Sequence, residues 1–331
     1  MSNVPGNYAT ELAEAKALQE SGDVPGAIPL YEQLAGKGST LAMVWLGYIY
    51  LKGGGVEADI NKALAWYLQA ASAGDGDAMG RLGTIYQLGD GVPADLAAAR
   101  QWYEKAARAG DVDGQYNLGV VLFEAGKIKL AMKWIGKAAE RGHAAAIRTR
   151  RDRNAYKLLE KKRYPQALPL LDLAASEGSA WAQEIIGWMH NGGHGVQQDY
   201  NEAIKHYEAA YSGDRRGAAI YIGRVHLEAK RPELALQWLR KDAHPSSSSL
   251  YWQYRVLKQH PGLGNHPREL RELLDEAAKS GHVFAKREIA VQMMKDRTAL
   301  TARLRGLRDF LCLLPEVFRI VCANPHDERL N

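Results

Sequence analysis

One segment of about 36 residues recurs along the chain, and this repetition decides the fold class before any local motif is considered. Gly38, Gly74 and Gly110 begin successive copies at intervals of 36 residues, and Gly178 begins a further copy. These copies open with GSTLAMVWLG, GDGDAMGRLG, GDVDGQYNLG and GSAWAQEIIG. A repeat of this length is typical of stacked helix pairs, because one pair cannot bury its apolar face alone.

The second half of a copy has the pattern of an amphipathic helix. The clearest examples are DINKALAWYLQAASAG, DLAAARQWYEKAARAG and DYNEAIKHYEAAYSG, which begin at Asp59, Asp95 and Asp199. In the first of them, apolar residues between Ala63 and Ala70 recur at a spacing that places them on one side of a helix. An aspartate at a helix start accepts hydrogen bonds from free backbone N–H groups, so we expect all three aspartates to be N-caps.

A glycine preceded by Leu or Ile occupies the middle of the first helix expected in each copy. These residues are Gly47, Gly83, Gly119, Gly187 and Gly223. Glycine inside a helix costs about 1 kcal/mol relative to alanine, so its recurrence needs a packing reason. We expect the Trp or Tyr of the paired helix to approach the glycine closely.

Three copies carry a glycine-rich loop between their two helices, namely LKGGGVEAD, QLGDGVPAD and NGGHGVQQD. Other copies have a short turn there, around Gly126 and Pro232. The sequence contains no G-x-S-x-G elbow, no Walker loop and no dinucleotide fingerprint on a strand. Because the glycine-rich loops recur at one place between two helices, we interpret them as turns rather than as phosphate-binding loops.

The combination of LG, GxGV, D, A, WY and AA at fixed offsets makes the loop-bearing copies resemble the Sel1-like repeat. The short copies resemble its relative, the tetratricopeptide repeat, and the resemblance covers residues 8–290. It implies an all-α fold, a right-handed α-α superhelix (solenoid) of about seven to eight Sel1-like or tetratricopeptide-like helix pairs over residues 1–290. Residues 291–331 are expected to form a C-terminal capping helix and a non-repeat tail.

The repeat pattern weakens in two regions. In 143–178, Asn154 and Ala155 replace the Leu–Gly pair, and beyond Ser246 the prolines at 261 and 267 interrupt the helical runs. Proline lacks a backbone donor and breaks a helix interior. We therefore expect the repeats to be irregular in these two regions.

The resemblance also implies a binding surface, because the first helices of such solenoids line a concave groove. Counted from the Leu–Gly pair, the expected groove residues are Tyr48, Leu51, Thr84, Gln87, Tyr116, Val120, Phe123, Trp181, Trp188, Arg224 and Leu227. Their chemistry varies while the packing positions repeat. Tyr, Trp and Arg are enriched at binding hot spots, although packing between helices is the alternative role for each of them.

The sequence predicts no catalytic residues, no metal site and no cofactor. His190 and His194 have the spacing of a metal-binding pair, but glycines separate them and no Cys or third His is suitably placed. His190 stands where sister copies have Tyr50 and Tyr86, so we interpret it as a packing residue. No combination of nucleophile and base can be assembled from the chain.

The charge pattern argues against nucleic acid as a partner. The formal net charge is +5, which is small for 331 residues. A run at 148–163 contains eight Lys and Arg, without the interleaved aromatic residues typical of single-strand binding. We interpret the run as a solvated helix face, with an acidic protein partner as the alternative.

The sequence predicts no integral membrane span, because no apolar run approaches 18 residues. The basic and apolar tail at 303–320 leaves two interpretations open, a cap over the last repeat or a peripheral membrane contact. The first residues lack the pattern of a secretory signal, so a cytoplasmic location is the default and a periplasmic one follows if a signal has been removed. Cys312 and Cys322 leave the redox compartment open.

These observations favour a non-enzymatic, bacterial scaffold or adaptor that binds a protein or peptide partner in the concave groove. Proteins resembling this family include immunity proteins that neutralise secreted toxins and components of envelope polysaccharide assembly. A few are credited with hydrolase activity, so the resemblance leaves these alternatives open.

Overall fold

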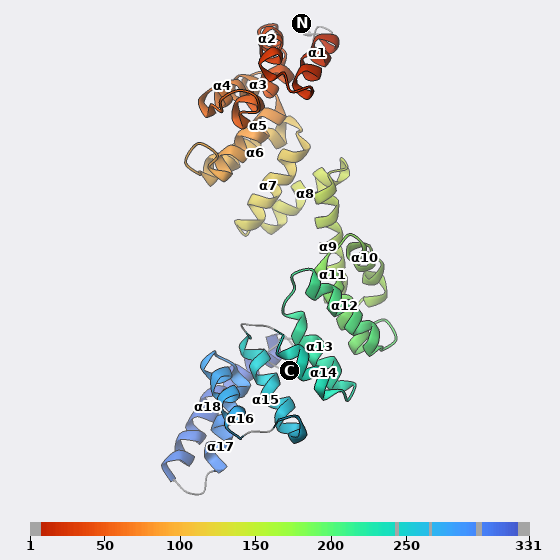
Figure 1. The fold of residues 1–331 in the computed structure, drawn as a ribbon, viewed down its shortest axis with the longest axis vertical. Helices are drawn as coiled ribbons and strands as arrows, with labels where there is room; N and C mark the ends of the chain where they lie inside the picture. Colours follow the sequence, from red (N-terminus) through yellow and green to blue (C-terminus); the bar gives the residue numbers. More distant parts are fainter. Residues whose placement is uncertain (1–7, 242–244, 265–266, 296–299, 324–331) are drawn as a thin grey trace. The chain divides into compact units, whose positions relative to one another are not determined.

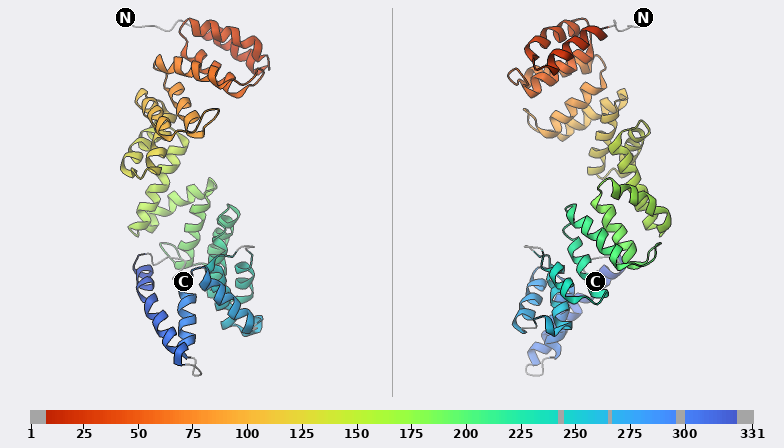
Figure 2. Two further views of the ribbon diagram at one scale, coloured as in Figure 1. Left: turned by 90° about the vertical axis from the view of Figure 1, so that its left-hand side faces the viewer. Right: turned by 45° about the vertical axis from the view of Figure 1, so that its right-hand side comes forward.

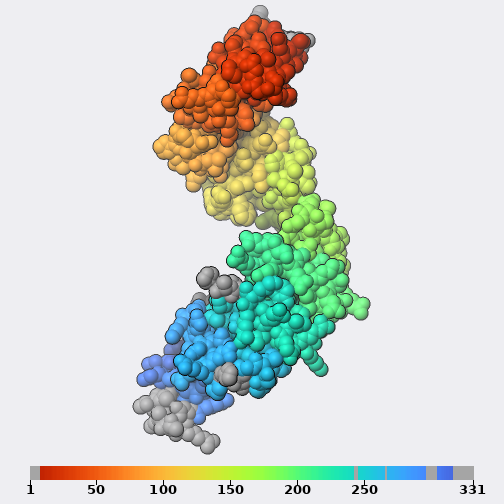
Figure 3. Space-filling view, viewed as in Figure 1, coloured from red at the N-terminus to blue at the C-terminus, as the bar shows by residue number. Residues whose placement is uncertain are grey.

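The computed structural model describes residues 8–241, 245–264, 267–295 and 300–323, without the side chains of 300–303 and 316–323. Over these residues the chain forms eighteen α-helices, one short 3-10 helix and no strand, which confirms the predicted all-α solenoid of helix pairs (Figure 1). The helices belong to two compact units, Met1–Arg153 and Asn154–Asn331. Successive helix pairs within each unit pack directly against one another (Figures 2 and 3).

Unit 1 contains four helix pairs and the beginning of α9. The pairs are α1 (Ala9–Glu20) with α2 (Val24–Gly36), α3 (Thr40–Lys52) with α4 (Ile60–Ser72), α5 (Gly76–Leu88) with α6 (Leu96–Ala109), and α7 (Val112–Glu124) with α8 (Ile128–Glu140). Each second helix also packs against the first helix of the following pair. The core therefore grows by one interface per pair.

Unit 2 begins within α9 (Ala144–Glu160) and repeats the same arrangement. It contains α10 (Tyr164–Ser176), the pairs α11 (Ala180–Gly192) with α12 (Tyr200–Ser212) and α13 (Ala218–Glu228) with α14 (Pro232–Leu239), then α15 (Ser247–Gln259), η1 (Pro261–Leu263), α16 (Pro267–Lys279), α17 (Val283–Lys295) and α18 (Leu300–Ala323). In this last group α15 packs with α16, and α17 packs with α18. Pro261 and Pro267 each start a helical segment, as the lack of a backbone donor favours.

The mid-helix glycines lie against the second helix of their own pair. A Cβ on Gly47 would lie 2.7 Å from the Tyr67 ring, and one on Gly83 would lie 2.6 Å from the Tyr103 ring. Gly187 faces Tyr207 in the same way. The predicted close approach of an aromatic ring is therefore confirmed in these pairs, and in each of them the ring is the tyrosine rather than the residue before it.

The two pairs with a short turn use an aliphatic side chain at the same contact. A Cβ on Gly119 would lie 2.5 Å from Ile135, and one on Gly223 would lie 2.8 Å from Leu239. The prediction of Trp or Tyr is wrong for these pairs, because a branched aliphatic side chain fills the space where the other pairs hold a ring.

Asp59, Asp95 and Asp199 cap the second helices, as their spacing predicts. The Asp95 carboxylate accepts hydrogen bonds from the backbone N–H groups of Ala97 and Ala98 at 2.9 and 3.0 Å. The backbone N–H of each capping aspartate also donates to a carbonyl near the end of the preceding helix. The cap therefore closes the glycine-rich loop as well as starting the helix.

The glycine-rich loops are turns that pack against the preceding helix pair. Gly91 has a φ of +75°, a conformation that favours glycine, and its ideal Cβ would lie 2.8 Å from Ile60 at the start of α4. Gly55 and Gly195 occupy the same place against Val24 and Tyr164. Glycine is therefore needed for the backbone conformation and for the close approach.

Candidate functional site

The contact between glycine and its partner fixes which side of each first helix faces its own pair. The residue after the glycine lies one position further round the helix, and it is Tyr48, Thr84, Val120, Trp188 and Arg224 in the five glycine-bearing pairs. None of these five side chains is fully buried. Within each unit, we call the surface formed by these positions and their neighbours on the same helices the first-helix face of that unit.

In unit 1, Tyr48 and Phe123 are the predicted groove residues that present large apolar surface to solvent. Their exposed fractions are 36% and 48%. Tyr48 meets Trp45 edge to face at 6.0 Å, and Trp45 stacks on the buried Tyr31 at 6.5 Å. Trp45 therefore contacts both a buried tyrosine of the core and the exposed Tyr48.

Thr84 and Gln87 also lie on α5, but they are hydrogen-bonded to the core. The hydroxyl of Tyr103 donates to the Gln87 Oε1 at 2.7 Å and lies 3.1 Å from the Thr84 Oγ1. Burial raises the pKa of Tyr103 above its ordinary value, although the hydrogen bond to Thr84 opposes this. These two predicted groove residues therefore provide hydrogen-bond partners for a buried hydroxyl. Their role in binding a partner stays a prediction.

The remaining predicted groove residues of unit 1 are half-buried. Tyr116 stacks on His143 with ring centroids 4.4 Å apart, and Leu51 packs against the core of the first pairs. Val120 is half-buried one position after Gly119. These three residues contribute packing as well as surface.

In unit 2, Trp188 is enclosed by other rings. It stacks on His194 of the glycine-rich loop at 4.1 Å and meets Tyr164 edge to face at 5.7 Å. Trp181 packs against the same apolar cluster. Both tryptophans therefore pack against neighbouring side chains, which is the alternative role expected from the sequence. Their role in binding stays a prediction.

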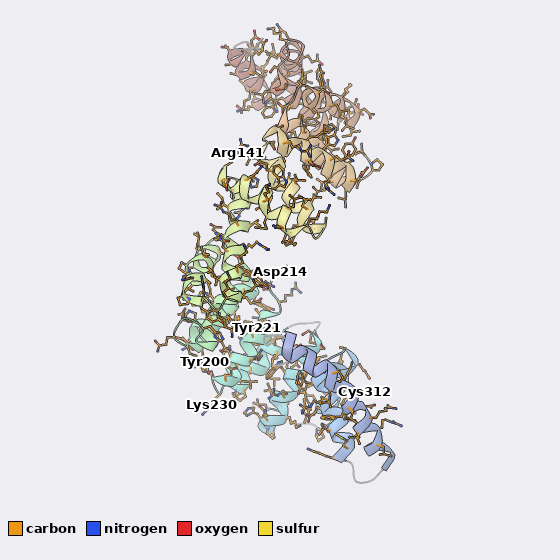
Figure 4. All side chains as sticks on the ribbon, turned by 180° about the vertical axis from the view of Figure 1, so that it is seen from behind. Arg141, Tyr200, Asp214, Tyr221, Lys230 and Cys312 are labelled. Atoms are coloured by element: carbon orange, nitrogen blue, oxygen red, sulfur yellow. The ribbon has the colours of Figure 1, made fainter. Side chains whose placement is uncertain are left out.

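Arg224 lies against the indole of Trp252, a residue outside the predicted groove. Its guanidinium carbon is 5.3 Å from the centroid of the Trp252 ring on α15, and that of Arg255 is 4.7 Å from the same ring. Burial lowers the pKa of Arg224 from its ordinary value. Leu227 packs against the cluster that contains Trp252, and Tyr221 precedes both Arg224 and Leu227 on the same helix (Figure 4).

Arg255 could have been found from the sequence by its distance from a capping serine. Ser179 precedes Gly187 by eight residues and caps α11, and Ser246 precedes Tyr254 by eight residues and caps α15. Tyr254 thus takes the place of the glycine, and Arg255 follows it. Because α15 has no glycine at this position, the glycine pattern alone does not align Arg255 with Arg224.

The histidines near the third glycine-rich loop form ring stacks. The rings of His190 and His206 are nearly parallel, with centroids 5.7 Å apart, and the His206 Nδ1 lies 2.6 Å from the Gln183 Oε1. Burial and then the neighbouring His190 lower the pKa of His206. Among the described residues, no three His, Cys, Asp or Glu side chains converge in a way that could hold a metal ion.

The sequence contains two kinds of known repeat. The Sel1 repeat matches residues 40–75, 76–111 and 112–143, and the tetratricopeptide repeat matches residues 194–248. No curated protein matches the chain. Within the described part of the chain, every helix is too short or too polar to cross a membrane.

Three solved structures match the chain to different extents. A protective antigen of uropathogenic Escherichia coli that displays an SLR fold is 22% identical, with a TM-score of 0.65 over 94% of this chain and 75% of that one. A Sel1 repeat protein from Oxalobacter formigenes is also 22% identical and covers 81% of this chain and 99% of its own, with a TM-score of 0.36. An immunity protein from Pseudomonas aeruginosa is 20% identical over 78% of this chain and 84% of its own, with a TM-score of 0.33. The chain therefore shares its fold with the first of these structures, and its sequence carries three Sel1 repeats and one tetratricopeptide repeat match.

Proposed function

We propose that the chain is a non-enzymatic adaptor that binds a protein or peptide partner along its first-helix face. Sel1 and tetratricopeptide repeats generally mediate interactions between proteins. The observation that carries the proposal is a contrast within one helical turn. Each mid-helix glycine meets a large side chain of the paired helix, whereas the next residue is Tyr, Thr, Val, Trp or Arg. A fixed scaffold with variable neighbouring positions suits recognition.

Tyr48 and Phe123 are the residues of unit 1 best suited to anchor a partner. Both lie on first helices, and both expose more than a third of their surface. Aromatic side chains provide a large contact area with few rotatable bonds, which makes them frequent hot spots. Truncating such a residue typically weakens binding by about 2 kcal/mol.

Affinity capture followed by mass spectrometry tests the proposal. The bait is the full chain, compared with a Tyr48→Glu and Phe123→Glu double variant. The matched control is Leu68→Glu with Leu130→Glu, since these leucines are 41% and 44% exposed but lie on the second helices α4 and α8. We expect the first-helix variant to lose the captured partner and the control to retain it, with both variants folded by circular dichroism. Equal capture by both variants would contradict the proposal.

The identity of the captured protein decides between the finer alternatives. A secreted toxin would assign an immunity role, and a membrane-associated polysaccharide synthesis protein would assign a role in envelope assembly. Hydrolase activity, the remaining alternative, would require turnover of a substrate by the purified chain. We propose the protein-binding role because both units combine a fixed packing contact at the mid-helix glycine with a variable residue after it.

A second candidate function, peripheral membrane contact, is favoured by the outer surface of α18. Leu304, Leu307, Leu311 and Leu314 are exposed along this helix and recur at alternating spacings of three and four residues. Arg305 is exposed beside them. An apolar helix stripe with neighbouring arginines suits binding in the interface of an anionic membrane.

Flotation with vesicles of phosphatidylglycerol and phosphatidylcholine tests this second candidate. We expect the full chain to float and a Leu304→Glu and Leu311→Glu variant to remain in the dense fraction. Leu88→Glu is the control, because Leu88 is the most exposed leucine of α5. If the full chain fails to float, or if the α18 variant floats equally well, membrane contact through α18 is wrong.

A further inference from the structure

Two arginines from successive helix pairs of unit 2 share one aromatic ring. Arg224 on α13 and Arg255 on α15 place their guanidinium carbons 5.3 and 4.7 Å from the centroid of the Trp252 ring. Trp252 is itself buried, with 8% of its surface exposed. A buried indole therefore holds two half-buried cations on the first-helix face, where cation–π contact stabilises both.

The two arginines occupy the same repeat position. Arg224 follows Gly223, and Arg255 follows Tyr254, which takes the glycine position of its pair. Corresponding positions of neighbouring first helices lie side by side in a stacked solenoid. The pairing of Arg224 with Arg255 is thus built by the repeat and does not depend on a flexible loop.

The positive charge of this pair is incompletely neutralised. Burial is the largest effect on Arg224 and lowers its pKa below the ordinary value; Glu228 opposes this shift, and Arg255 adds a smaller effect in the same direction as burial. Glu228, four residues further along α13, is exposed, and its charge favours the charged form of Arg224. Within the described residues neither arginine has a carboxylate within salt-bridge distance. Two neighbouring like charges that are partly desolvated favour the binding of an anion.

Two other cations of unit 2 are paired with carboxylates. Lys258 on α15 forms a salt bridge of 2.5 Å with Glu288, and Arg215 lies 3.5 Å from Glu184. The Nε1 of Trp252 is buried without a hydrogen-bond partner in the described structure. Arg224 and Arg255 are thus the half-buried cations that lie on the Trp252 ring.

We propose that Arg224 and Arg255 form a binding site for an aspartate or glutamate side chain of a protein partner. The inference rests on the proposed adaptor function and names the chemistry that one part of the first-helix face recognises. Guanidinium groups bind carboxylates through two parallel hydrogen bonds, and their affinity for a flat carboxylate exceeds that for a neutral amide. An acidic segment lying across α13 and α15 would present its carboxylate to both arginines.

Fluorescence anisotropy with a defined peptide tests the proposal. The probe is the fluorescein-labelled, C-terminally amidated peptide LEELEE, and the comparison peptide is LQQLQQ, which keeps the shape and removes the charge. We expect the full chain to bind the glutamate peptide at least tenfold more tightly than the glutamine peptide. Because salt screens the interaction, the difference should shrink as ionic strength rises.

Variants locate the site. Arg224→Gln and Arg255→Gln should each weaken binding of the glutamate peptide about tenfold, whereas Arg268→Gln should leave it unchanged. Arg268 is a suitable control because 91% of its side chain is exposed on α16. Circular dichroism and the melting temperature check that each variant is folded. Glutamine keeps part of the aliphatic stem, so a loss of binding without a loss of fold assigns the effect to charge.

Each remaining outcome contradicts the inference. Equal binding of the two peptides, no binding of either, or unchanged binding by both arginine variants would show that the pair does not recognise carboxylates. Affinity capture with the Arg224→Gln and Arg255→Gln double variant separates this failure from failure of the adaptor function. A partner retained in full by that variant refutes the acid site alone, whereas capture unaffected by the Tyr48 and Phe123 substitutions refutes the adaptor proposal.

Discussion

Substitution of Gly83 by alanine should destabilise unit 1, even though alanine is the better helix former. The new Cβ would lie 2.6 Å from both Cδ1 and Cε1 of Tyr103, whereas carbons in contact are about 3.5–4.0 Å apart. The ring must therefore move by about 1 Å, but it is 1% exposed and its hydroxyl is held by Gln87. Overpacking of this kind costs roughly 1–3 kcal/mol.

The gain in helix propensity offsets part of that cost. Replacing a helical glycine by alanine contributes about 1 kcal/mol, so the expected net effect is a loss of about 1–2 kcal/mol once the hydrogen bond to Gln87 is strained. Gly136 provides a matched control in the same unit. It lies inside α8 with no atom within 4 Å of its ideal Cβ, so Gly136→Ala should stabilise by about 0.5–1 kcal/mol.

Urea denaturation followed by circular dichroism at 222 nm measures both variants against the unsubstituted chain. The predicted changes in the free energy of unfolding have opposite signs, although the chemical change is identical. If Gly83→Ala unfolds at the same urea concentration as Gly136→Ala, or at a higher one, the close approach of Tyr103 does not explain the repeated glycine.

Three further predictions follow from individual contacts. His282, 1% exposed, accepts a hydrogen bond from the N–H of Ala285, and burial lowers its pKa to about 4. Since the unfolded histidine takes up a proton near pH 6.5 and the folded one only near 4, stability should fall by roughly 2–3 kcal/mol as the pH drops through this window. His282→Asn, which keeps a capping acceptor, should flatten that dependence in melting curves, and an unchanged pH profile would exclude His282 as its source. Asp95→Ala removes both N-cap hydrogen bonds of α6 and should lower the free energy of unfolding by about 1 kcal/mol, with Asp95→Asn close to the unsubstituted chain. Tyr103→Phe should lower it by a similar amount, since it removes the hydroxyl that donates to Gln87, and an unaltered midpoint would show that this bond contributes nothing.

The repeat alone was enough to predict the helix pairs, their N-caps and the close contact at the glycine. It could not predict which side chain fills that contact, because Ile135 and Leu239 satisfy the same space as a tyrosine. Tyrosine differs in one respect that the sequence does reveal, namely that its buried hydroxyl needs a partner. That requirement explains why Thr84 and Gln87 are hydrogen-bonded to the Tyr103 hydroxyl. Their expected position in the groove did not predict these bonds.

The caps of the first helices show a second limit of sequence reasoning. Ser39 and Asp75 are capping residues of the preferred types, and their side chains accept from the backbone as expected. His143 and His282 occupy the same repeat position and use the ring Nδ1 as the acceptor. Histidine is not a preferred cap, so only alignment of the repeats, rather than residue propensity, could have assigned these two residues.

Around Gly223, the residue that packs the helix pair and the residue proposed to recognise a partner are neighbours within a single helical turn. Gly223 needs its lack of a side chain because Leu239 lies against it, so the chain there tolerates little change. Arg224, the next residue, turns away from that contact and meets Trp252 instead. Substitutions at Arg224 should therefore alter what the surface binds while leaving the helix pair intact, and substitutions at Gly223 should do the reverse. Under the proposed adaptor function, a change of partner at this pair would therefore occur through Arg224, without repacking the contact between Gly223 and Leu239.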